Sequence, residues 1–112
     1  MHELSLAMEV VELSQREADK NGVSIIHEIL IEVGDLSGIE ADVFQSALEM
    51  VKKDTLLEDA IVRLIRTPGK GKCSTCNMEF EMKYRLDICP CGGFPSEISG
   101  GQEFRVVSLV AE

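Results

Sequence analysis

The chain has 112 residues, of which 45% are apolar, and its 20 acidic and 11 basic side chains give a formal net charge of −9. This length fits one domain with at most a small appendage, and the acidic balance excludes a protein that binds nucleic acid through a basic face. No apolar run could span a membrane and no secretory signal begins the sequence, so we expect a cytoplasmic protein with reduced cysteines.

The first predicted element is an amphipathic helix over residues 3–20. Apolar residues recur at helical spacing from Leu4 to Ala18, and charged residues lie between them. Asn21 and Gly22 follow, and both tolerate the left-handed conformation with which helices commonly end. The first residue of the predicted helix, Glu3, directly follows Met1 and His2.

A strand over residues 23–34 and a helix within residues 34–53 are predicted next. Apolar and polar residues alternate along the strand, which predicts a buried face made of Ile25, Ile29, Ile31 and Val33, together with His27. We interpret His27 as a hydrogen-bonded core histidine rather than a metal ligand. The helix has one apolar stripe, made of Val43, Phe44, Ala47, Leu48 and Val51.

Alternation predicts two further strands. One covers residues 59–67 and buries Ala60, Val62 and Leu64, and the other covers residues 103–112 and buries Phe104, Val106 and Val110. The first two strands are joined through a helix, so they should pair in parallel by a right-handed crossover. The short segment "PGKGK" after the second strand is predicted to be a loop.

Residues 68–101 differ in composition from the rest of the chain. They contain all four cysteines, all three prolines and six of the nine glycines. The large apolar residues are too few to form a stable core without a cross-link such as a bound metal ion or a disulfide. Met78, Phe80, Met82 and Tyr84 alternate there, and we expect them to pack this lobe against the rest. The predicted fold is α/β (α+β): a mixed three-stranded sheet with two helices, residues 1–67 and 102–112, and an inserted zinc-ribbon domain, residues 68–101.

The four cysteines indicate a zinc site. Cys73 and Cys76 form a C-x2-C pair, and Cys89 and Cys91 form a C-x-C pair twelve residues later. Two close pairs separated by a hairpin-length stretch are typical of a zinc ribbon, in which four thiolates surround the ion. Disulfides and free buried thiols are the alternatives, and a redox pair would need a strand-to-helix setting that is absent here.

Such a site is closed, because four protein ligands leave no position for water, so the zinc is expected to be structural. Asn77 after the first pair, and Gly92 and Gly93 after the second, accept the positive φ that the turns around the ion demand. The second pair has only Pro90 between its cysteines, and this short spacing predicts a more labile zinc site than a regular ribbon has.

The start of the chain offers nitrogen donors for a second metal. The Met1 amine, the His2 backbone nitrogen and the His2 imidazole can chelate one ion, with the Glu3 backbone nitrogen or carboxylate as a fourth donor. Ni(II) and Cu(II) suit such nitrogen-rich sets. The first N–H groups of a helix also lack intrahelical acceptors. The alternative is a solvated helix start in which Glu3 complements the helix dipole.

Taken together, "MHELSL", "EVGDLSGIE", "GKCSTC" and "GGQEFRVVSL" resemble the HypA/HybF family of hydrogenase maturation factors, in order and over nearly the whole chain. The resemblance implies a metallochaperone that delivers Ni(II) to the large subunit of [NiFe]-hydrogenase together with the GTPase HypB. Some members also serve urease and its accessory proteins. By position, Met1, His2 and Glu3 would hold nickel, and the four cysteines would hold zinc, although C-x-C departs from the family's C-P-x-C.

The resemblance also suggests an acidic residue near the nickel at Glu40. Ser37 and Glu40 fit a capping box for the second helix as well, and we favour that role. No nucleophile–base pair is evident, so we expect no enzymatic activity. The sequence leaves the oligomeric state open between a monomer and a homodimer. The alternative function is a zinc-ribbon adaptor between proteins that does not deliver nickel.

Overall fold

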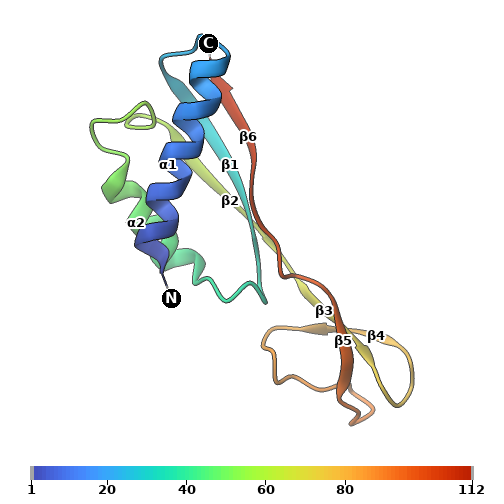
Figure 1. Cartoon of the computed structure of the whole chain (residues 1–112). Coiled ribbons are helices and arrows are strands. Elements are labelled where there is room, and N and C mark those ends of the chain that lie inside the picture. Colours follow the sequence, from blue (N-terminus) through green and yellow to red (C-terminus); the bar gives the residue numbers. More distant parts are fainter. Residues whose placement is uncertain (1, 112) are drawn as a thin grey trace.

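Two three-stranded sheets lie end to end along an elongated molecule of 53 × 24 × 17 Å (Figure 1). The computed structural model describes residues 2–111. The first sheet has the order β2-β1-β6, in which β1 pairs in parallel with β2 and antiparallel with β6. Its strands are β1 (Ile26–Gly34), β2 (Ile61–Thr67) and β6 (Phe104–Ala111). The predicted mixed sheet with parallel first strands is confirmed.

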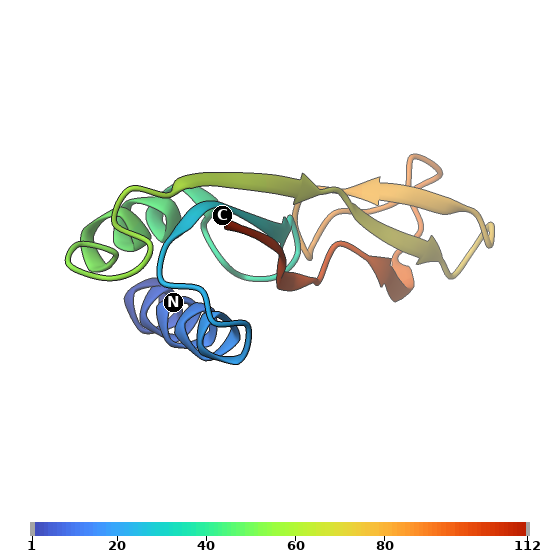
Figure 2. The same cartoon turned by 90° about the horizontal axis from the view of Figure 1, so that it is seen from above.

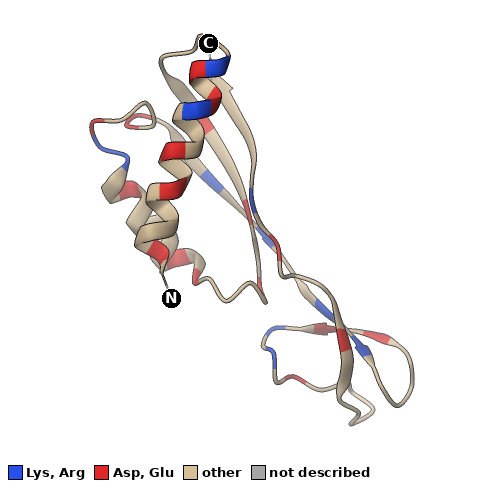
Figure 3. Ribbon diagram, viewed as in Figure 1, with Lys and Arg blue, Asp and Glu red and all other residues tan. Residues whose placement is uncertain are grey.

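Both helices contribute to the core of this first sheet. They are α1 (Glu3–Lys20), with the bounds that the sequence predicts, and α2 (Ala41–Val51). Ala7 and Val10 of α1 and Phe44 and Leu48 of α2 are buried in one cluster with the inward residues of β1. Seen from above, the second sheet extends away from both helices (Figure 2). Acidic residues outnumber basic ones along the helices (Figure 3).

The second sheet is antiparallel and contains the cysteines. Its order is β4-β3-β5, with the strands β3 (Gly69–Cys73), β4 (Glu79–Met82) and β5 (Pro95–Gly100). The "PGKGK" segment is therefore largely strand, and its predicted assignment as a loop was wrong. A Cβ on Gly69 would lie 2.4 Å from the Met82 carbonyl oxygen and 2.5 Å from Leu36 Cγ. The glycine thus allows close strand packing rather than a turn.

The small core of this second sheet contains Leu36, Cys73, Phe80, Met82 and Cys89, with Ile98 packed against it. Leu36 follows β1, so one side chain from the first part of the chain packs into the cysteine-containing part. The prediction for the alternating residues is half right. Phe80 and Met82 are buried, whereas Met78 and Tyr84 are mostly exposed.

A β-bulge in β1 changes which residues face the core. Ile26 pairs with Ala111 and Glu28 with Val110, so His27 is an extra residue in the ladder. A bulge shifts the alternation of side chains by one position. Ile26 is consequently buried, while Ile25 and His27 are exposed. The predicted core position of His27 is therefore wrong.

A second bulge lies in β6. Leu30 pairs with Ser108 and Ile31 with Val106, which leaves Val107 as the extra residue. Beyond it Leu109 packs against the core and Val110 is exposed, contrary to the sequence prediction. Val43 of α2 is also exposed, although Phe44, Ala47 and Leu48 form the predicted buried stripe.

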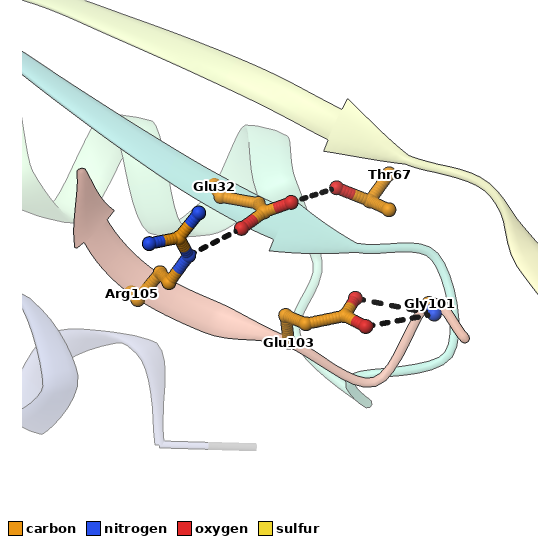
Figure 4. A network of polar contacts seen from close by, with 5 residues as sticks. All are labelled: Glu32, Thr67, Gly101, Glu103 and Arg105. Carbon is orange, nitrogen blue, oxygen red and sulfur yellow. Dashed lines mark hydrogen bonds and ion pairs between the residues drawn. The ribbon is translucent and has the colours of Figure 1, made fainter. Parts of the chain in front are cut away.

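The two sheets are joined where β2 continues into β3 and where β5 continues into β6. Figure 4 shows Glu32 of β1 at this junction, where it accepts hydrogen bonds of 2.6 Å from both Thr67 Oγ1 and Arg105 Nε. The Thr67 hydroxyl and the Arg105 guanidinium lower the pKa of Glu32. The Gly101 N–H donates to the Glu103 carboxylate at 3.1 Å in the same region. The Glu32 carboxylate of β1 therefore connects all three strands of the first sheet, through Thr67 of β2 and Arg105 of β6.

We expect Glu32→Gln to destabilise the fold at neutral pH and to flatten its acid dependence. A group whose folded pKa is lowered stabilises the fold above its ordinary value of about 4.3 and loses that contribution as the pH falls through the folded value. Thermal unfolding between pH 7 and pH 3 measures this. The matched control is Glu28→Gln, which breaks only the more exposed 3.1 Å pair with Arg63. Equal effects of both variants would contradict the role assigned to the junction.

Candidate metal sites

Two turns bring the four cysteines together. In the first, the Cys73 N–H donates to the Met78 carbonyl at 2.9 Å, and Asn77 has the predicted positive φ, of 61°. In the second, the Gly92 N–H donates to the Cys89 carbonyl at 2.7 Å, and Gly92 has φ 93°. Gly93 has another role than the predicted positive φ, because a Cβ there would lie 2.6 Å from Cys73 Sγ.

The sulfur positions fit a four-coordinate metal. Cys73 Sγ lies 3.5 Å from Cys91 Sγ, and Cys76 Sγ lies 3.8 Å from Cys89 Sγ. All four sulfurs lie within 4.8 Å of one another. Tetrahedral thiolates at about 2.3 Å from zinc are separated by about 3.8 Å, so these distances match the requirement. The predicted cysteine cluster is confirmed as a group that could hold a metal.

The thiols differ in their electrostatics. Cys73 Sγ accepts N–H hydrogen bonds from Cys76 at 3.5 Å and from Thr75 at 3.3 Å, and these lower the pKa of Cys73 to about 6 despite its burial. The Cys91 backbone N–H lowers the pKa of Cys89, but burial and the neighbouring thiols raise it more, to about 12. Cys73 therefore loses its proton to become a thiolate more readily than Cys89 or Cys91, whose pKa values are raised.

His2 occupies the N-cap position of α1 and is exposed. Its carbonyl accepts a hydrogen bond from the Leu6 N–H at 2.9 Å, while its side chain makes no capping hydrogen bond. An open groove of about 290 Å³ lies beside it, lined by His2, Glu3, Ser5, Leu6, Glu9, Ser37 and Ile39. The imidazole is thus not used to cap the helix. Met1, the other predicted nitrogen donor, lies outside the described residues.

Glu3 is buried and ties the two helices together at their N-terminal ends. Its Oε2 accepts a hydrogen bond from the Glu40 backbone N–H at 3.2 Å. Burial raises the pKa of Glu3, but hydrogen bonds from the backbone N–H groups of Glu40 and of Glu3 itself lower it more, so the net direction is downward. Sequence reasoning missed this contact, because residues 37 positions apart show no periodicity that would connect them.

The capping box predicted for α2 does not form. Glu40 is its N-cap without a side-chain capping hydrogen bond, and Ser37 Oγ accepts instead from the Ile39 N–H at 3.2 Å. Glu40 also lines a different cavity from His2, one that includes Asp35, Arg66, Lys83 and Tyr84. The structure therefore brings His2 and Glu3 together, and only the backbone of Glu40 joins them.

Comparisons with known proteins agree along the whole chain. Residues 1–111 match the family described as "Hydrogenase/urease nickel incorporation, metallochaperone, hypA". A hydrogenase maturation factor HypA of Geobacter metallireducens is 37% identical over 113 residues and covers 100% of both chains. One of Parabacteroides distasonis is 42% identical over 98% of this chain and 96% of its own.

A solved structure with the same fold belongs to the Ni metallochaperone HypA from Helicobacter pylori. It aligns with a TM-score of 0.68 and 26% identity, covering 99% of this chain and 97% of that chain. None of the helices that the structure describes is long and apolar enough to cross a membrane.

Proposed function

The chain belongs to the HypA family of hydrogenase and urease nickel-incorporation metallochaperones, and on this premise we propose that it binds Ni(II) at its N-terminus and delivers it to the large subunit of [NiFe]-hydrogenase. Members of this family are maturation factors and not enzymes. Nickel is the cargo, and the four-cysteine domain, residues 68–101, holds a structural zinc. The resemblance suggests the GTPase HypB as a partner, with urease accessory proteins in some members. We propose that the protein delivers nickel in the cytoplasm.

One observation supports the nickel site above the others. His2 is exposed at the N-cap of α1 with its imidazole free of any capping hydrogen bond, and the first amides of a helix have no intrahelical acceptor. An amide there can give up its proton to a metal without breaking a helical bond. The donors would be the Met1 amine, the His2 backbone nitrogen and imidazole, and the Glu3 backbone nitrogen, a set that suits Ni(II).

Release would follow from ligand exchange. His2 is exposed at the start of α1, so a partner can approach an ion bound there without unfolding the protein. Thiolates of the receiving protein are softer and stronger ligands than an amine and an imidazole, and they can replace them one at a time. Loading this protein with nickel and mixing it with unprocessed large subunit tests delivery. Nickel should move to the large subunit, and its retention would leave the adaptor function as the better description.

The Glu3 carboxylate is already engaged with the Glu40 N–H, so we assign the Glu3 backbone rather than its side chain to the metal. Glu3→Gln should therefore weaken nickel binding by less than about tenfold, because the amide oxygen can still accept that hydrogen bond. Glu3→Ala should weaken it more, by loosening the contact between α1 and α2. Nickel titrations of the two variants measure the difference. Equal loss in both would identify the carboxylate as a ligand.

The resemblance suggests Glu40 as a further nickel ligand, and we do not assign it to the site. Glu40 lines the cavity that includes Asp35 and Arg66 and does not line the groove beside His2, so we expect Glu40→Gln to change nickel affinity by less than about twofold. The same titration, run beside Glu3→Gln, provides the comparison. A drop of about tenfold or more would place Glu40 among the ligands.

A further inference from the structure

The four cysteines of the metal site include two close pairs, and each pair joins the two turns. Cys73 Sγ lies 3.5 Å from Cys91 Sγ, and Cys76 Sγ lies 3.8 Å from Cys89 Sγ. The first cysteine of each pair belongs to the turn after β3, and the second belongs to the turn before β5. The S–S length of a disulfide is about 2.05 Å, so each pair has to close by less than about 2 Å to form one.

Each pair also combines one exposed cysteine with one buried cysteine. Cys91 is exposed, whereas its neighbour Cys73 is buried, with 0% of its surface exposed. Cys76 is exposed, whereas its neighbour Cys89 is 6% exposed. Zinc binds all four as thiolates, and among thiolates exposure decides which sulfur an oxidant reaches first. One sulfur of each pair is therefore open to an oxidant, and the other is placed to close a disulfide.

Disulfides within one turn are less favourable. A bond from Cys89 to Cys91 would close through a single residue, Pro90, whose ring fixes its φ angle and leaves little freedom to adjust. In the first turn, two backbone N–H groups donate to Cys73 Sγ at 3.3 and 3.5 Å, and they hold this sulfur beside that of Cys91. The geometry therefore favours disulfides between the turns.

We propose that a peroxide oxidises these cysteines to two disulfides, Cys73–Cys91 and Cys76–Cys89, and that the zinc is released as they form. Residues 68–101 then have a reduced, zinc-bound form and an oxidised, zinc-free form. In a reducing compartment such disulfides are transient, because thiol reductants reverse them. The inference rests on the structural zinc of the proposed function, and it adds a redox modification to that site without involving nickel.

The reaction is the same in both pairs, and it balances. The exposed thiolate attacks one oxygen of hydrogen peroxide, the O–O bond breaks, and the sulfur becomes a sulfenic acid while the departing hydroxide takes up a proton. The buried thiolate then attacks the sulfenic sulfur, the S–S bond forms, and the S–O bond breaks with loss of a second hydroxide, which is also protonated. Four thiolates, two peroxide molecules and four protons thus give two disulfides and four water molecules, while the charge of Zn²⁺ is unchanged.

The test uses the zinc-loaded full chain and hydrogen peroxide. A chromogenic chelator measures the released zinc, and we expect about one zinc ion for every two peroxide molecules that the cysteines consume. Mass spectrometry of tryptic peptides identifies the disulfides, because cleavage after Lys83 and Arg85 separates the two turns. Peptides from the two turns should appear linked. A dithiol reductant with added Zn²⁺ should restore the original zinc content.

Fragmentation of the linked peptides should join Cys73 to Cys91 and Cys76 to Cys89. Disulfides within either turn, sulfinic acids without disulfides, or retention of zinc by the oxidised chain would each overturn the proposal. A chain without zinc before oxidation would overturn both the structural zinc and this proposal. A zinc-loaded chain that oxidises in another way would overturn this proposal alone, so the two failures are distinguishable.

An exposed methionine provides a matched control. Met78 is 65% exposed, and its carbonyl accepts the Cys73 N–H at 2.9 Å in the first turn. Oxidation of its thioether to a sulfoxide is thus another way in which peroxide could loosen the site. Met78→Leu removes that route, and this variant should release zinc at a rate within about twofold of the unmodified chain. Loss of zinc release in Met78→Leu would overturn the assignment to the cysteines.

The disulfides should also keep the oxidised segment ordered. Both bonds join the turn after β3 to the turn before β5, so they replace the metal as the cross-link, and cross-links restrict the unfolded chain. Amide hydrogen exchange compares the oxidised chain with the reduced chain after chelation, since both lack zinc. Protection in β3 and β5 should be at least about tenfold higher in the oxidised chain. Equal exchange in the two would overturn the proposed second form of residues 68–101.

Discussion

Removal of zinc is expected to disorder residues 68–101 while α1, α2 and the sheet β2-β1-β6 remain folded. Among residues 2–111, which the structure describes, the core of the cysteine-containing sheet has five buried residues, and two of them, Cys73 and Cys89, belong to the metal site. Within the same range the core of the first sheet has twelve buried residues, all outside residues 68–101. Structural zinc contributes on the order of 10 kcal/mol or more to the folding of such small domains, far more than the remaining apolar contacts there can replace.

Amide hydrogen exchange before and after chelation measures this effect segment by segment. Protection should fall in β3, β4 and β5 and persist in β1 and β2. Cys73→Ser should reproduce much of the loss, because Cys73 is fully buried and accepts two backbone N–H groups. Cys91→Ser, at an exposed position in the short C-x-C pair, should be milder. Loss of protection throughout the chain would mean that the two sheets fold as one unit.

Replacement of His2 by Ala should abolish measurable nickel binding and leave zinc binding unchanged. The imidazole is the one side-chain nitrogen that we assign to the site, and it makes no capping hydrogen bond that its removal would cost. The helical circular dichroism should therefore stay the same. Metal analysis after equilibrium dialysis against Ni(II) gives both metal contents in one experiment.

The chain offers a matched control for this substitution. His27 is its other histidine and is exposed at the bulge of β1. His27→Ala should retain full nickel binding. Equal losses in the two variants would indicate nonspecific imidazole binding. A His2→Ala protein with unchanged nickel content would remove the physical basis of the N-terminal site.

Periodicity predicted the elements of the first sheet well, because its helices and strands each bury one face. The helix bounds from Glu3 to Lys20 followed directly from it, and the helix between the first two strands predicted the parallel pairing of β1 with β2. The errors at Ile25, His27 and Val110 share one cause. Extra residues in the ladder at His27 and Val107 shift the alternation, and a bulge of this kind has no reliable mark in a single sequence.

The candidate sites divide in the same way. The pattern of cysteines predicted the sulfur cluster, because ligand spacing is local and chemically specific. The strand at Gly69 was missed because glycine is ordinarily a turn residue, and its close packing against Met82 and Leu36 depends on the tertiary structure. The bond from the Glu40 N–H to Glu3 is also a long-range contact, and it replaced the capping role that a local motif suggested.

The claim that nickel binds at the N-terminus is tested most directly by calorimetry with Ni(II) on the untagged, zinc-loaded protein and on the same chain extended by two N-terminal residues. The extension keeps every side chain but converts the Met1 amine to an amide, which removes one proposed donor. We predict that the untagged protein binds one nickel per chain and that the extended protein binds it much more weakly. Equal affinities, or no heat of binding with either protein, would contradict the proposed site.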